Sequence, residues 1–578
     1  MLSTPSTSRF TITQWLIIVI ASIGFLFDTY ELLMTPLVGV PAIADLLKLP
    51  PNHPTVTGWM GRMLWMTALC GGTFGLLGGW LIDRFGRKTI MAASIFVYAL
   101  SPFAAAFATT LPAFIFFRCT TFIGVCVEFV AAITWLAEVF PEKRRKEIAL
   151  GSTQAFASLG GLLVTAISVW ISTHAGALPV LPISAAFNQH APWRYLLLTG
   201  LLPAIPIAFL LPFVPESQIW RERRALGTLQ RPSFAALFSP QLRRVTLVTA
   251  ALSACAYAAA FGALQITTRS VVPGLPELAP QRQALKPLRA EADDLNRQID
   301  AVMPAFRRAS AEVPGLERLA GQRAKVRIAQ RAARKADNKE QLTALGKEFA
   351  GYDAELDKIT AENPEAKAAV VEREKLLKAL GDNREKQEPY VAVLNARGDK
   401  VQFGQELGGL VGRIILAGLL VTAIPRGRML RFFLIPGIIV FAITYNQFYH
   451  AGGWLFSAGI FFCGLLVVAQ FSYFGEYLPK IFPIHLRGTG GSFATNVGGR
   501  MIGTSAAFLS TNIIAPMLNP HPTFDHYAVA AGITGTAVFV VAFFLSFLLP
   551  EPKDEMHGGT DDGPVRDPET RPPASTPT

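Results

Sequence analysis

The chain has 578 residues, of which 51% are hydrophobic and 16% are charged, and its formal net charge at pH 7 is +12. Soluble proteins carry about 25% charged residues, whereas this chain contains recurrent apolar runs of about 20 residues, the length that crosses about 30 Å of hydrocarbon. These properties exclude a soluble globular protein and predict an all-α membrane protein. The basic residues fall mainly in short loops and in one charged block, so they indicate cytoplasmic loops rather than nucleic-acid binding.

Twelve apolar segments are long enough to span a membrane. We expect six spans at roughly 12–38, 56–82, 88–110, 112–139, 147–173 and 193–214. Six more are expected at roughly 244–270, 400–424, 429–449, 452–478, 489–515 and 526–549. The pattern predicts two six-helix halves.

The predicted organisation divides the chain at its changes of composition. Its parts are a first half at 1–214, a linker at 215–243, helix seven at 244–273, an insertion at 274–399, helices eight to twelve at 400–550 and a tail at 551–578. The linker is rich in arginine and short, which predicts a cytoplasmic position for it and therefore for both termini. The protein is then expected to be multi-pass in the cytoplasmic (inner) membrane. The tail has no apolar periodicity and is predicted to be disordered.

The insertion at 274–399 would lie on the outer side, because long segments are translocated largely regardless of their charge. Apolar residues spaced alternately by three and four predict a coiled-coil seam at Leu342, Leu345, Phe349, Tyr352, Leu356 and Ile359. A looser apolar stripe comprises Leu285, Leu288, Leu295, Ile299 and Phe306, with Pro287 and Pro304 interrupting it. Pro314 and Pro364 are expected to end helices. The prediction is a helical hairpin or small bundle that could bind an extracytoplasmic protein partner.

The stretch GGWLIDRFGRKTI at 78–90 places four charged residues between two uncharged stretches. It resembles the signature loop between helices two and three of the major facilitator superfamily. The resemblance implies a conformational gate formed by Gly79, Asp83, Arg84, Gly86, Arg87 and Lys88. A charge cluster at helix termini can find different partners in two arrangements of the helices. Simple anchoring of a cytoplasmic loop would require neither the acid nor the glycines.

Three further stretches resemble elements of the same superfamily. AEVFPEKRR contains the gate residues Glu138 and Arg145, and YLPKIFPIHLRGTG contains Arg487. VPES at 214–217 is similar to an element of sugar porters and metabolite:proton symporters. Two departures stand out: Lys480 occupies a position where the family usually has an acid, and the loop AIPRGRML between helices eight and nine lacks the acid of the repeated signature.

Ionisable residues inside the spans cost roughly 2.5–3.5 kcal/mol each on insertion scales, so each suggests a function. The first span contains Asp28 and Glu31, and the fourth contains Arg118 and Glu128. An acid in helix one and an arginine in helix four resemble the proton-coupling pair of sugar porters. Phosphate and metabolite:proton symporters have a further acid ten residues after that arginine, where Glu128 stands. The alternatives are that Glu31 reaches the outer interface and that the pair is static and only sets the packing.

Other polar residues within the spans are candidates for binding a substrate. They are Arg413, Arg500, Gln154, Gln265, Asn446, Gln470 and Asn496. Arg500 resembles a basic residue of organic-acid symporters, and glutamines in helices five and seven contact sugars in sugar porters. Arg62 is expected near the end of its helix, where it can reach the interface. Each amide could instead form hydrogen bonds between helices.

The sequence therefore predicts a transporter that runs proton-coupled symport of a small organic anion by alternating access in the lipid bilayer. The buried arginines need counter-charges, which a carboxylate would supply. The alternatives are a proton-coupled sugar or polyol transporter and a transporter-like receptor that binds a partner through the insertion. No nucleophile–base set, metal-ligand cluster or nucleotide loop is present in the sequence, so neither an enzyme, nor a cofactor or metal, nor a nucleic-acid partner is expected.

Overall fold

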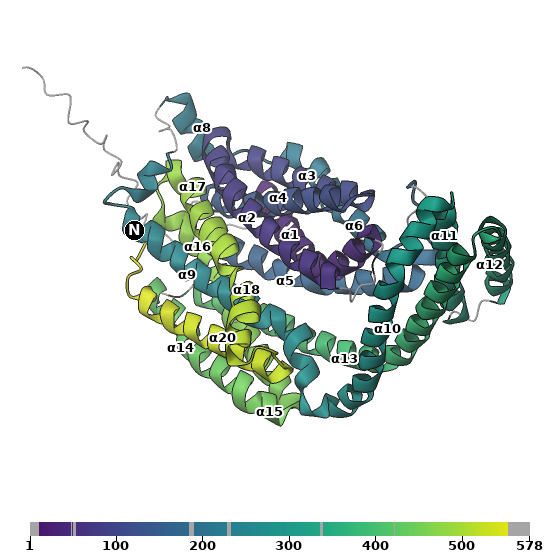
Figure 1. Ribbon diagram of the computed structural model, residues 1–578. Coiled ribbons are helices and arrows are strands. Elements are labelled where there is room, and N and C mark those ends of the chain that lie inside the picture. Colours follow the sequence, from purple (N-terminus) through teal and green to yellow (C-terminus); the bar gives the residue numbers. More distant parts are fainter. Residues whose placement is uncertain are drawn as a thin grey trace, which may run out of the picture. The chain divides into compact units, whose positions relative to one another are not determined.

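The computed structural model describes residues 11–47, 49, 54–140, 142–183, 190–227, 233–335, 339–420, 422 and 424–552, which Figure 1 shows as ribbons. The predicted tail lies outside the described residues from position 553 onward. All regular structure within the described ranges is helical. Internal contacts divide the chain into Met1–Val271 with Val401–Thr578, which we call the membrane unit, and Val272–Lys400, which we call the inserted unit.

Twelve helices among the described residues are long and apolar enough to cross a membrane, which confirms the predicted number of spans and the all-α class. In the first half the spans are α1 (Ile12–Leu47), α2 (Pro54–Phe85), α3 (Arg87–Ala106), α4 (Leu111–Val139), α5 (Lys143–His174) and α6 (Pro192–Leu198) with α7 (Ala204–Leu210). In the second half they are α9 (Arg243–Ala259), the end of α13 (Pro364–Leu420), α14 (Arg426–Ile443), α16 (Gly453–Ile481), α17 (Arg487–Ser492) with the π-helical η11 (Phe493–Gly503), and α20 (Phe524–Ser546). Short helices α8 (Gln218–Ala225), α15 (Tyr449–Ala451), α18 (Ala506–Phe508) and α19 (Ala515–Leu518) complete the membrane unit. The orientation of the termini stays a prediction.

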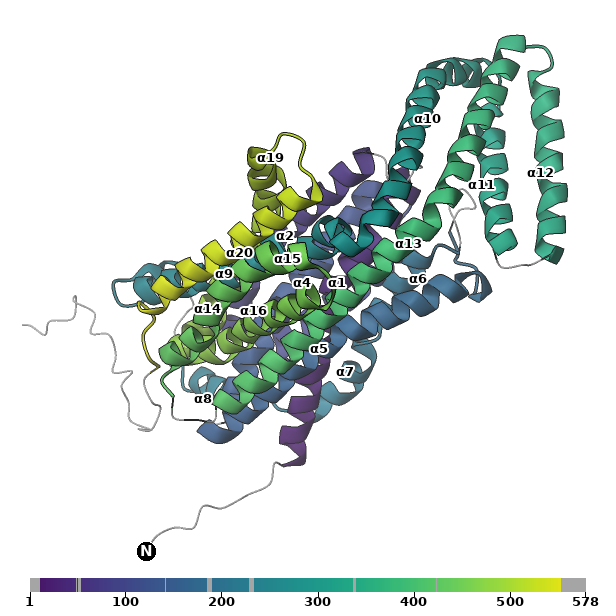
Figure 2. The same cartoon turned by 90° about the horizontal axis from the view of Figure 1, so that it is seen from below.

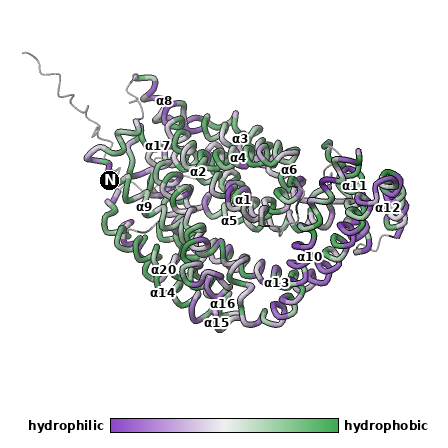
Figure 3. Tube along the Cα trace, viewed as in Figure 1, coloured by the Kyte–Doolittle hydropathy of each residue, from purple (hydrophilic) through white to green (hydrophobic). Residues whose placement is uncertain are grey.

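The spanning helices are rich in hydrophobic residues, as Figure 3 shows by hydropathy, and many of their large apolar side chains are exposed. Phe209 is 72% exposed and Phe544 is 66% exposed. Exposed apolar side chains in such number are expected where helices contact lipid.

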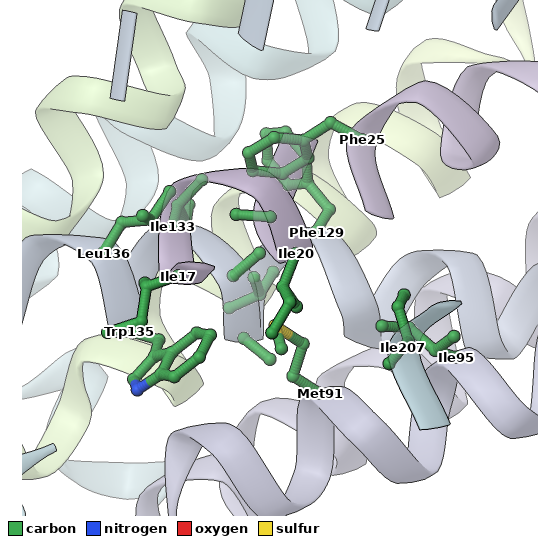
Figure 4. Packing of buried hydrophobic residues seen from close by; sticks show 14 of the residues in the cluster. Ile17, Ile20, Phe25, Met91, Ile95, Phe129, Ile133, Trp135, Leu136 and Ile207 are labelled. Carbon is green, nitrogen blue, oxygen red and sulfur yellow. The ribbon is translucent and has the colours of Figure 1, made fainter. Parts of the chain in front are cut away.

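The core of the first half joins α1, α3, α4 and α7. Figure 4 shows its packing around Ile17, Ile20, Phe25, Met91, Ile95, Phe129, Ile133, Trp135, Leu136 and Ile207. Eight of these ten side chains are fully buried, and Phe25 and Phe129 are nearly so. This packing fixes α1 beside α4, and these two helices carry all four of the residues predicted to couple protons.

Glycines allow α13 to approach α16 closely. Gly404, Gly408 and Gly412 recur every four residues, and a Cβ at Gly408 or Gly412 would collide with the carbonyl oxygen of Phe461 or Leu465. Small residues at this spacing permit backbone-to-backbone packing of helices in membranes. The stretch GQELGGLVG carries this signal in the sequence, and it holds the polar residues of α13 at fixed positions.

The inserted unit contains α10 (Ala279–Glu312), α11 (Leu316–Lys335), α12 (Lys339–Thr360) and the first part of α13. Figure 2 shows α11 and α12 side by side. Pro314 lies between α10 and α11, and Pro364 begins α13, as expected for helix ends. Pro287 and Pro304, however, lie inside a continuous α10. The buried side chains Leu285, Ala292, Phe306 and Ala309 hold that helix by packing, so the loss of single backbone hydrogen bonds does not end it.

Ion pairs connect the basic helix α11 to its neighbours within the inserted unit. Arg327 pairs with Glu374 at 2.5 Å and Arg331 pairs with Asp382 at 2.9 Å, while Arg323 contacts Asp353. On α12, Leu356 is buried and Tyr352 and Ile359 pack against an apolar cluster that includes Phe306. The predicted coiled-coil character of this seam stays a prediction, as does a protein partner at 274–399.

The two ends of the inserted unit lie close together. Arg397 pairs with Glu277 at 3.0 Å, and Arg282 donates hydrogen bonds to the carbonyl oxygens of Pro273 and Leu275. The eighth span was predicted to start at 400, but α13 runs from Pro364 to Leu420 without a break there.

We expect that a short flexible linker in place of residues 278–396 leaves the membrane unit folded. The ends are already adjacent, and changing the length of a loop costs little entropy when its ends are held, about 0.6 kcal/mol per doubling. The truncated chain should elute as a single species in size-exclusion chromatography, with a melting temperature within a few degrees of the full chain. Aggregation of the truncated chain, under conditions that keep the full chain dispersed, would contradict this.

Candidate functional site

A cavity of about 130 Å³ lies between the two halves of the membrane unit. Its polar lining consists of Asp28 and Thr29 from α1, Gln154 and Ser158 from α5, Tyr257 from α9, Gln265 after it, Gln405, Glu406 and Arg413 from α13, and Arg500 from η11. Its aromatic lining consists of Phe25, Phe129, Tyr257, Phe261 and Phe471. A concave site with apolar walls and few convergent polar groups is typical of small-molecule binding.

Arg500 joins the two halves inside this cavity. It is 1% exposed, and its Nη2 lies 3.2 Å and 3.4 Å from the two carboxylate oxygens of Asp28. Its Nη1 donates to the carbonyl oxygen of Val125 at 3.0 Å. Asp28 and Val125 belong to the first half and Arg500 to the second, so the ion pair bridges the halves.

Arg413 is buried without a carboxylate in contact. It is 8% exposed and its Nη1 donates to the backbone oxygen of Gln154. No carboxylate oxygen of the described residues lies within ion-pair distance of Arg413, and its Nε has no hydrogen-bond partner among them. The side-chain Nε2 of Gln154 is likewise unpaired in the described part of the chain. These unpaired donors line a cavity, which is the arrangement that an anionic ligand would complete.

Glu31 and Arg118 form a second buried pair, within the first half. Arg118 Nη1 lies 3.5 Å from Glu31 Oε2, and its Nη2 donates to the Glu31 carbonyl at 3.3 Å and to the hydroxyl of Thr35. Glu31 is 1% exposed, so it does not reach the outer interface. An acid of helix one therefore does meet the arginine of helix four, but that acid is Glu31, while Asp28 pairs with Arg500.

Glu128 lies on α4 and is fully buried. It packs against Gly24 of α1, and neither of its carboxylate oxygens accepts a hydrogen bond from a described residue. A charged carboxylate without a partner is costly at this depth. Glu128 is thus a position where a proton would remove a large electrostatic cost.

Asp83 ties the end of α2 to the start of α17 in the other half. It accepts hydrogen bonds from the backbone nitrogens of Gly488 at 3.0 Å and Thr489 at 2.8 Å, and from the Thr489 hydroxyl at 2.8 Å. Gly79 faces Gly488, where a Cβ would collide with the backbone. A carboxylate at the first turn of a helix satisfies otherwise unpaired N–H groups. This contact closes one end of the gap between the halves.

Arg87 lies beside this contact and is fully buried. Its Nε lies 3.0 Å from Glu138 Oε2, and its Nη2 donates to the carbonyl oxygen of Ile484 at 2.8 Å. Glu138 also lies 3.6 Å from Arg487 Nη1 and accepts a hydrogen bond from Ser217. Arg87, Glu138 and Arg487 therefore form one network that crosses between the halves.

The VPES stretch caps the start of α3. Glu216 accepts hydrogen bonds from the backbone nitrogens of Arg87 and Lys88, both at 3.0 Å. Lys88 Nζ donates to the Val214 carbonyl at 2.7 Å. Gly86 precedes the helix with a φ of 104°, a conformation that favours glycine.

The second half contains matching contacts that the sequence reasoning missed. Glu551 accepts from the backbone nitrogens of Arg426 at 2.8 Å and Gly427 at 2.9 Å, at the start of α14. Arg426 also pairs with Glu476 at 3.2 Å and contacts Glu147 of the first half. The signals were present, since LPEP at 549–552 resembles VPES, and GEYLP at 475–479 resembles AEVFP.

Lys480 also joins these contacts, since it lies 3.5 Å from Glu147 and contacts Glu476. A base at this position is therefore matched by an acid from α5. Although Lys480 replaces the acid that the family usually has, its contact with Glu147 still connects the two halves.

Comparison with known proteins agrees with this architecture. The model of the Major Facilitator Superfamily matches residues 9–280. The chain superposes on the proton:xylose symporter XylE with a TM-score of 0.51 and 15% identity, over 93% of this chain and 96% of that one. The E. coli fucose:proton symporter FucP gives a TM-score of 0.51 with 11% identity, over 92% and 99% of the two chains. At such identities the likeness shows the fold.

Membership of the major facilitator superfamily is supported by the match over the first half of the chain. The chain is 26% identical to a niacin transporter of Acinetobacter baylyi over 34% of this chain and 40% of that protein. It is 32% identical to a 4-hydroxybenzoate transporter of Pseudomonas aeruginosa over 26% and 30% of the two chains. It is also 32% identical to a glucose transport protein of Synechocystis over 37% and 44%. The chain therefore spans less than half the length of these three relatives.

Some of the residues predicted to bind substrate lie outside the cavity lining. Asn446 is exposed, and Gln470 is buried with its Nε2 bonded to the Leu466 carbonyl of its own helix at 3.1 Å. Asn496 donates to the Cys126 carbonyl at 3.1 Å and accepts from Arg500 at 3.4 Å, so it supports Arg500 between helices. Arg413, Arg500, Gln154 and Gln265 line the cavity, and their contact with a substrate stays a prediction.

Two predicted gate residues lie apart from the buried network. Arg84 is exposed and its guanidinium lies over the ring of Trp80 at 4.9 Å. Arg145 pairs with its neighbour Glu142 at 2.7 Å at the surface. Glu406 and Gln405, in contrast, line the cavity but were not predicted. The spacing of seven residues between Glu406 and Arg413 places both on one helix face and could have indicated them.

We expect Asp83→Asn to loosen the start of α17 without unfolding the protein. The amide keeps one acceptor but loses the charge and presents N–H groups to the backbone donors. Hydrogen–deuterium exchange of residues 487–492 should accelerate about tenfold or more, which corresponds to about 1.4 kcal/mol. Glu222→Gln on the exposed face of α8 is the matched control. Unchanged exchange in the Asp83 variant would remove this residue from the closing contact.

Proposed function

We propose that this protein is a proton-coupled symporter of a small organic anion that works by alternating access. The observation that carries the proposal is Arg413, a buried guanidinium in the central cavity whose described surroundings hold no carboxylate within ion-pair distance. An unpaired charge in a low-dielectric interior is costly, so a ligand that brings a carboxylate is favoured at this place. The neighbouring Nε2 of Gln154 is a second donor for the same group.

The walls of the cavity favour an anion with a planar apolar body. Tyr257 and Phe471 have ring centroids 4.7 Å apart, and Tyr257 stacks with Phe261 at 6.0 Å. All three line the cavity that Arg413 also lines. Relatives of this chain are named for niacin, for cis,cis-muconate and for 4-hydroxybenzoate, all of which are planar carboxylic acids. An aromatic or conjugated carboxylate is therefore the substrate class that we favour.

A sugar or polyol is the second candidate. Three side-chain amides, those of Gln154, Gln265 and Gln405, line the cavity and could bind hydroxyl groups. Other relatives are named for glucose and arabinose transport. Neutral sugars would leave Arg413 without a carboxylate in direct contact, which is why we rank them second.

Proton coupling is assigned to the buried acids of α1 and α4. Asp28 and Glu31 each face an arginine, and Glu128 has no described hydrogen-bond partner. A carboxylate that exchanges an arginine for a proton changes the net charge of the region between the halves. Because the Asp28–Arg500 pair bridges the halves, its rupture would favour their separation.

Alternating access is supported by the position of the gate network. Asp83, Arg87 and Glu138 connect the halves at one end. Glu147 of the first half and Arg426 of the second half form a further contact between the halves. Rocking of one helix bundle against the other around a central site is the usual mode of transporters built from two related halves. Breaking this network would open the closed end.

The proposal is tested by proton flux in vesicles that contain the purified full-length protein. Addition of 4-hydroxybenzoate, nicotinate or cis,cis-muconate should drive proton uptake, whereas glucose and arabinose should not. Arg413→Gln should weaken anion binding about 10- to 100-fold, since a hydrogen bond to a charged group contributes about 1.5–3 kcal/mol. Arg62→Gln, on an exposed arginine of α2, is the control. Sugar-driven flux without anion-driven flux would reverse the ranking of the two substrate classes.

Asp28→Asn should abolish accumulation against a gradient while exchange of bound substrate persists in part. Asparagine keeps the polar shape but cannot bind and release a proton. Counterflow and uphill uptake of the same radiolabelled anion separate the two activities. Undiminished uphill uptake would remove Asp28 from the coupling role.

Arg118→Lys should impair uphill transport although the positive charge is retained. A point ammonium cannot reproduce the contacts of one guanidinium with Glu31 and Thr35 together. Uptake driven by a pH gradient should fall at least tenfold with little change in the amount of folded protein. Wild-type rates in the lysine variant would show that charge alone suffices.

A further inference from the structure

Glu406 is a second acid in the central cavity, and the functional assignment above makes no use of it. It lies on α13 seven residues before Arg413, on the same helix face, and both side chains line the cavity. At 1.5 Å per residue the two positions are about 10 Å apart along the helix. The close contact of Gly408 and Gly412 with α16 fixes this helix in place.

The cavity is balanced in charge when it holds no substrate. Its charged and titratable lining residues are Asp28, Glu406, Arg413, Arg500 and Tyr257. With a neutral tyrosine, two carboxylates face two guanidinium groups. An anion that enters therefore leaves one uncompensated negative charge in a low-dielectric site, which is costly unless a proton enters with it.

The two acids differ in how firmly they are bound. Both oxygens of Asp28 contact Arg500, at 3.4 Å and 3.2 Å. Glu406 has no arginine or lysine nitrogen within ion-pair distance in the described chain. Its Oε1 accepts a hydrogen bond from the amide of Gln405 at 3.3 Å, and its carboxyl lies against Gly161 of α5. A proton on Asp28 would break an ion pair, whereas a proton on Glu406 would break none.

The geometry points to Glu406 as the group that takes up a proton in the same step in which the substrate anion binds Arg413. This inference rests on the proposed transport of an anion and adds a residue in helix eight to the acids of α1 and α4. A proton from solution moves to a carboxylate oxygen of Glu406 while the anion fills the unpaired donors of Arg413 and Gln154. The net charge of the cavity then stays at zero, and release of the anion releases the proton.

The test measures proton uptake on anion binding, with the purified full-length protein in weakly buffered detergent and a pH-indicator dye. The probes are benzoate, nicotinate and 4-hydroxybenzoate, each titrated between mildly acidic and mildly basic pH. The wild type should take up about one proton per bound anion, and its affinity should fall up to tenfold per pH unit above the pH at which Glu406 titrates. Raising the pH removes the proton that must bind with the anion, which gives the sign of this effect.

Glu406→Gln should abolish the proton uptake and make the affinity independent of pH, because the cavity then carries one positive charge that the anion itself neutralises. Glu385→Gln removes an exposed acid from the inserted part of the same helix and should behave like the wild type. Glu406→Asp keeps a carboxyl and should retain the uptake with a shifted pH profile. If the glutamine variant does not fold, the aspartate variant and infrared detection of a new carboxylic-acid band in the anion-bound wild type decide the question.

The outcomes separate this inference from the function on which it rests. Uptake in Glu406→Gln equal to that of the wild type, or anion binding by the wild type without uptake, overturns the role of Glu406 and leaves anion transport standing. An unshifted pH profile in Glu406→Asp, or no new infrared band on anion binding, overturns it as well. Failure of every probe to bind the wild type overturns the proposed function and this inference together.

Discussion

A charge placed between spanning helices has to be compensated, because on insertion scales each costs roughly 2.5–3.5 kcal/mol. This constraint explains most of the polar architecture of the membrane unit. Arg87 is fully buried and is matched by Glu138 and by carbonyl oxygens. Arg118 and Arg500 are matched by Glu31 and Asp28. Arg413, Glu128 and Glu406 are exceptions among the described residues, and our proposals place a ligand or a proton at each of them.

The two halves contain the same type of contact at corresponding positions, where an acid caps a helix that begins with an arginine. In the first half, Glu216 caps the helix that begins with Arg87. In the second half, Glu551 caps the helix that begins with Arg426. Both arginines then pair with an acid of the following long helix, Glu138 or Glu476. A repeated set of buried ion pairs at one end of both halves gives a boundary that can open or close as a unit, since each pair depends on the packing of its neighbours.

The number of spans and the class of fold could be predicted from the sequence because they depend on length and apolar content alone. The residues that pair with the buried charges could not be predicted from the sequence. The sequence placed Asp28 and Glu31 on one side of a helix, but their arginines come from α4 and from η11, and only tertiary packing decides which acid meets which arginine. Glu406 was not predicted as a site residue, since it lies near the predicted start of a span rather than in its middle. The GQELGGLVG stretch already contained both the packing glycines and that acid.

The continuity of two helices, α10 and α13, also could not be predicted from the sequence. Pro287 and Pro304 lie inside α10, and α13 passes through position 400 without a break. Local rules for ending helices are weak where buried side chains on either side hold the helix by packing.

The cavity and the gate are linked by the way their contacts are distributed between the halves. Arg413 and Arg500 belong to the second half, whereas Gln154, Val125 and Asp28, which satisfy them, belong to the first. Separation of the halves would therefore strip both arginines of their partners at once. An anion bound between them can replace those partners, so it lowers the cost of separation in a way that an empty cavity cannot. In the proposed transport cycle, substrate binding and opening of the gate are then thermodynamically coupled, so that the halves separate more readily when the substrate is bound.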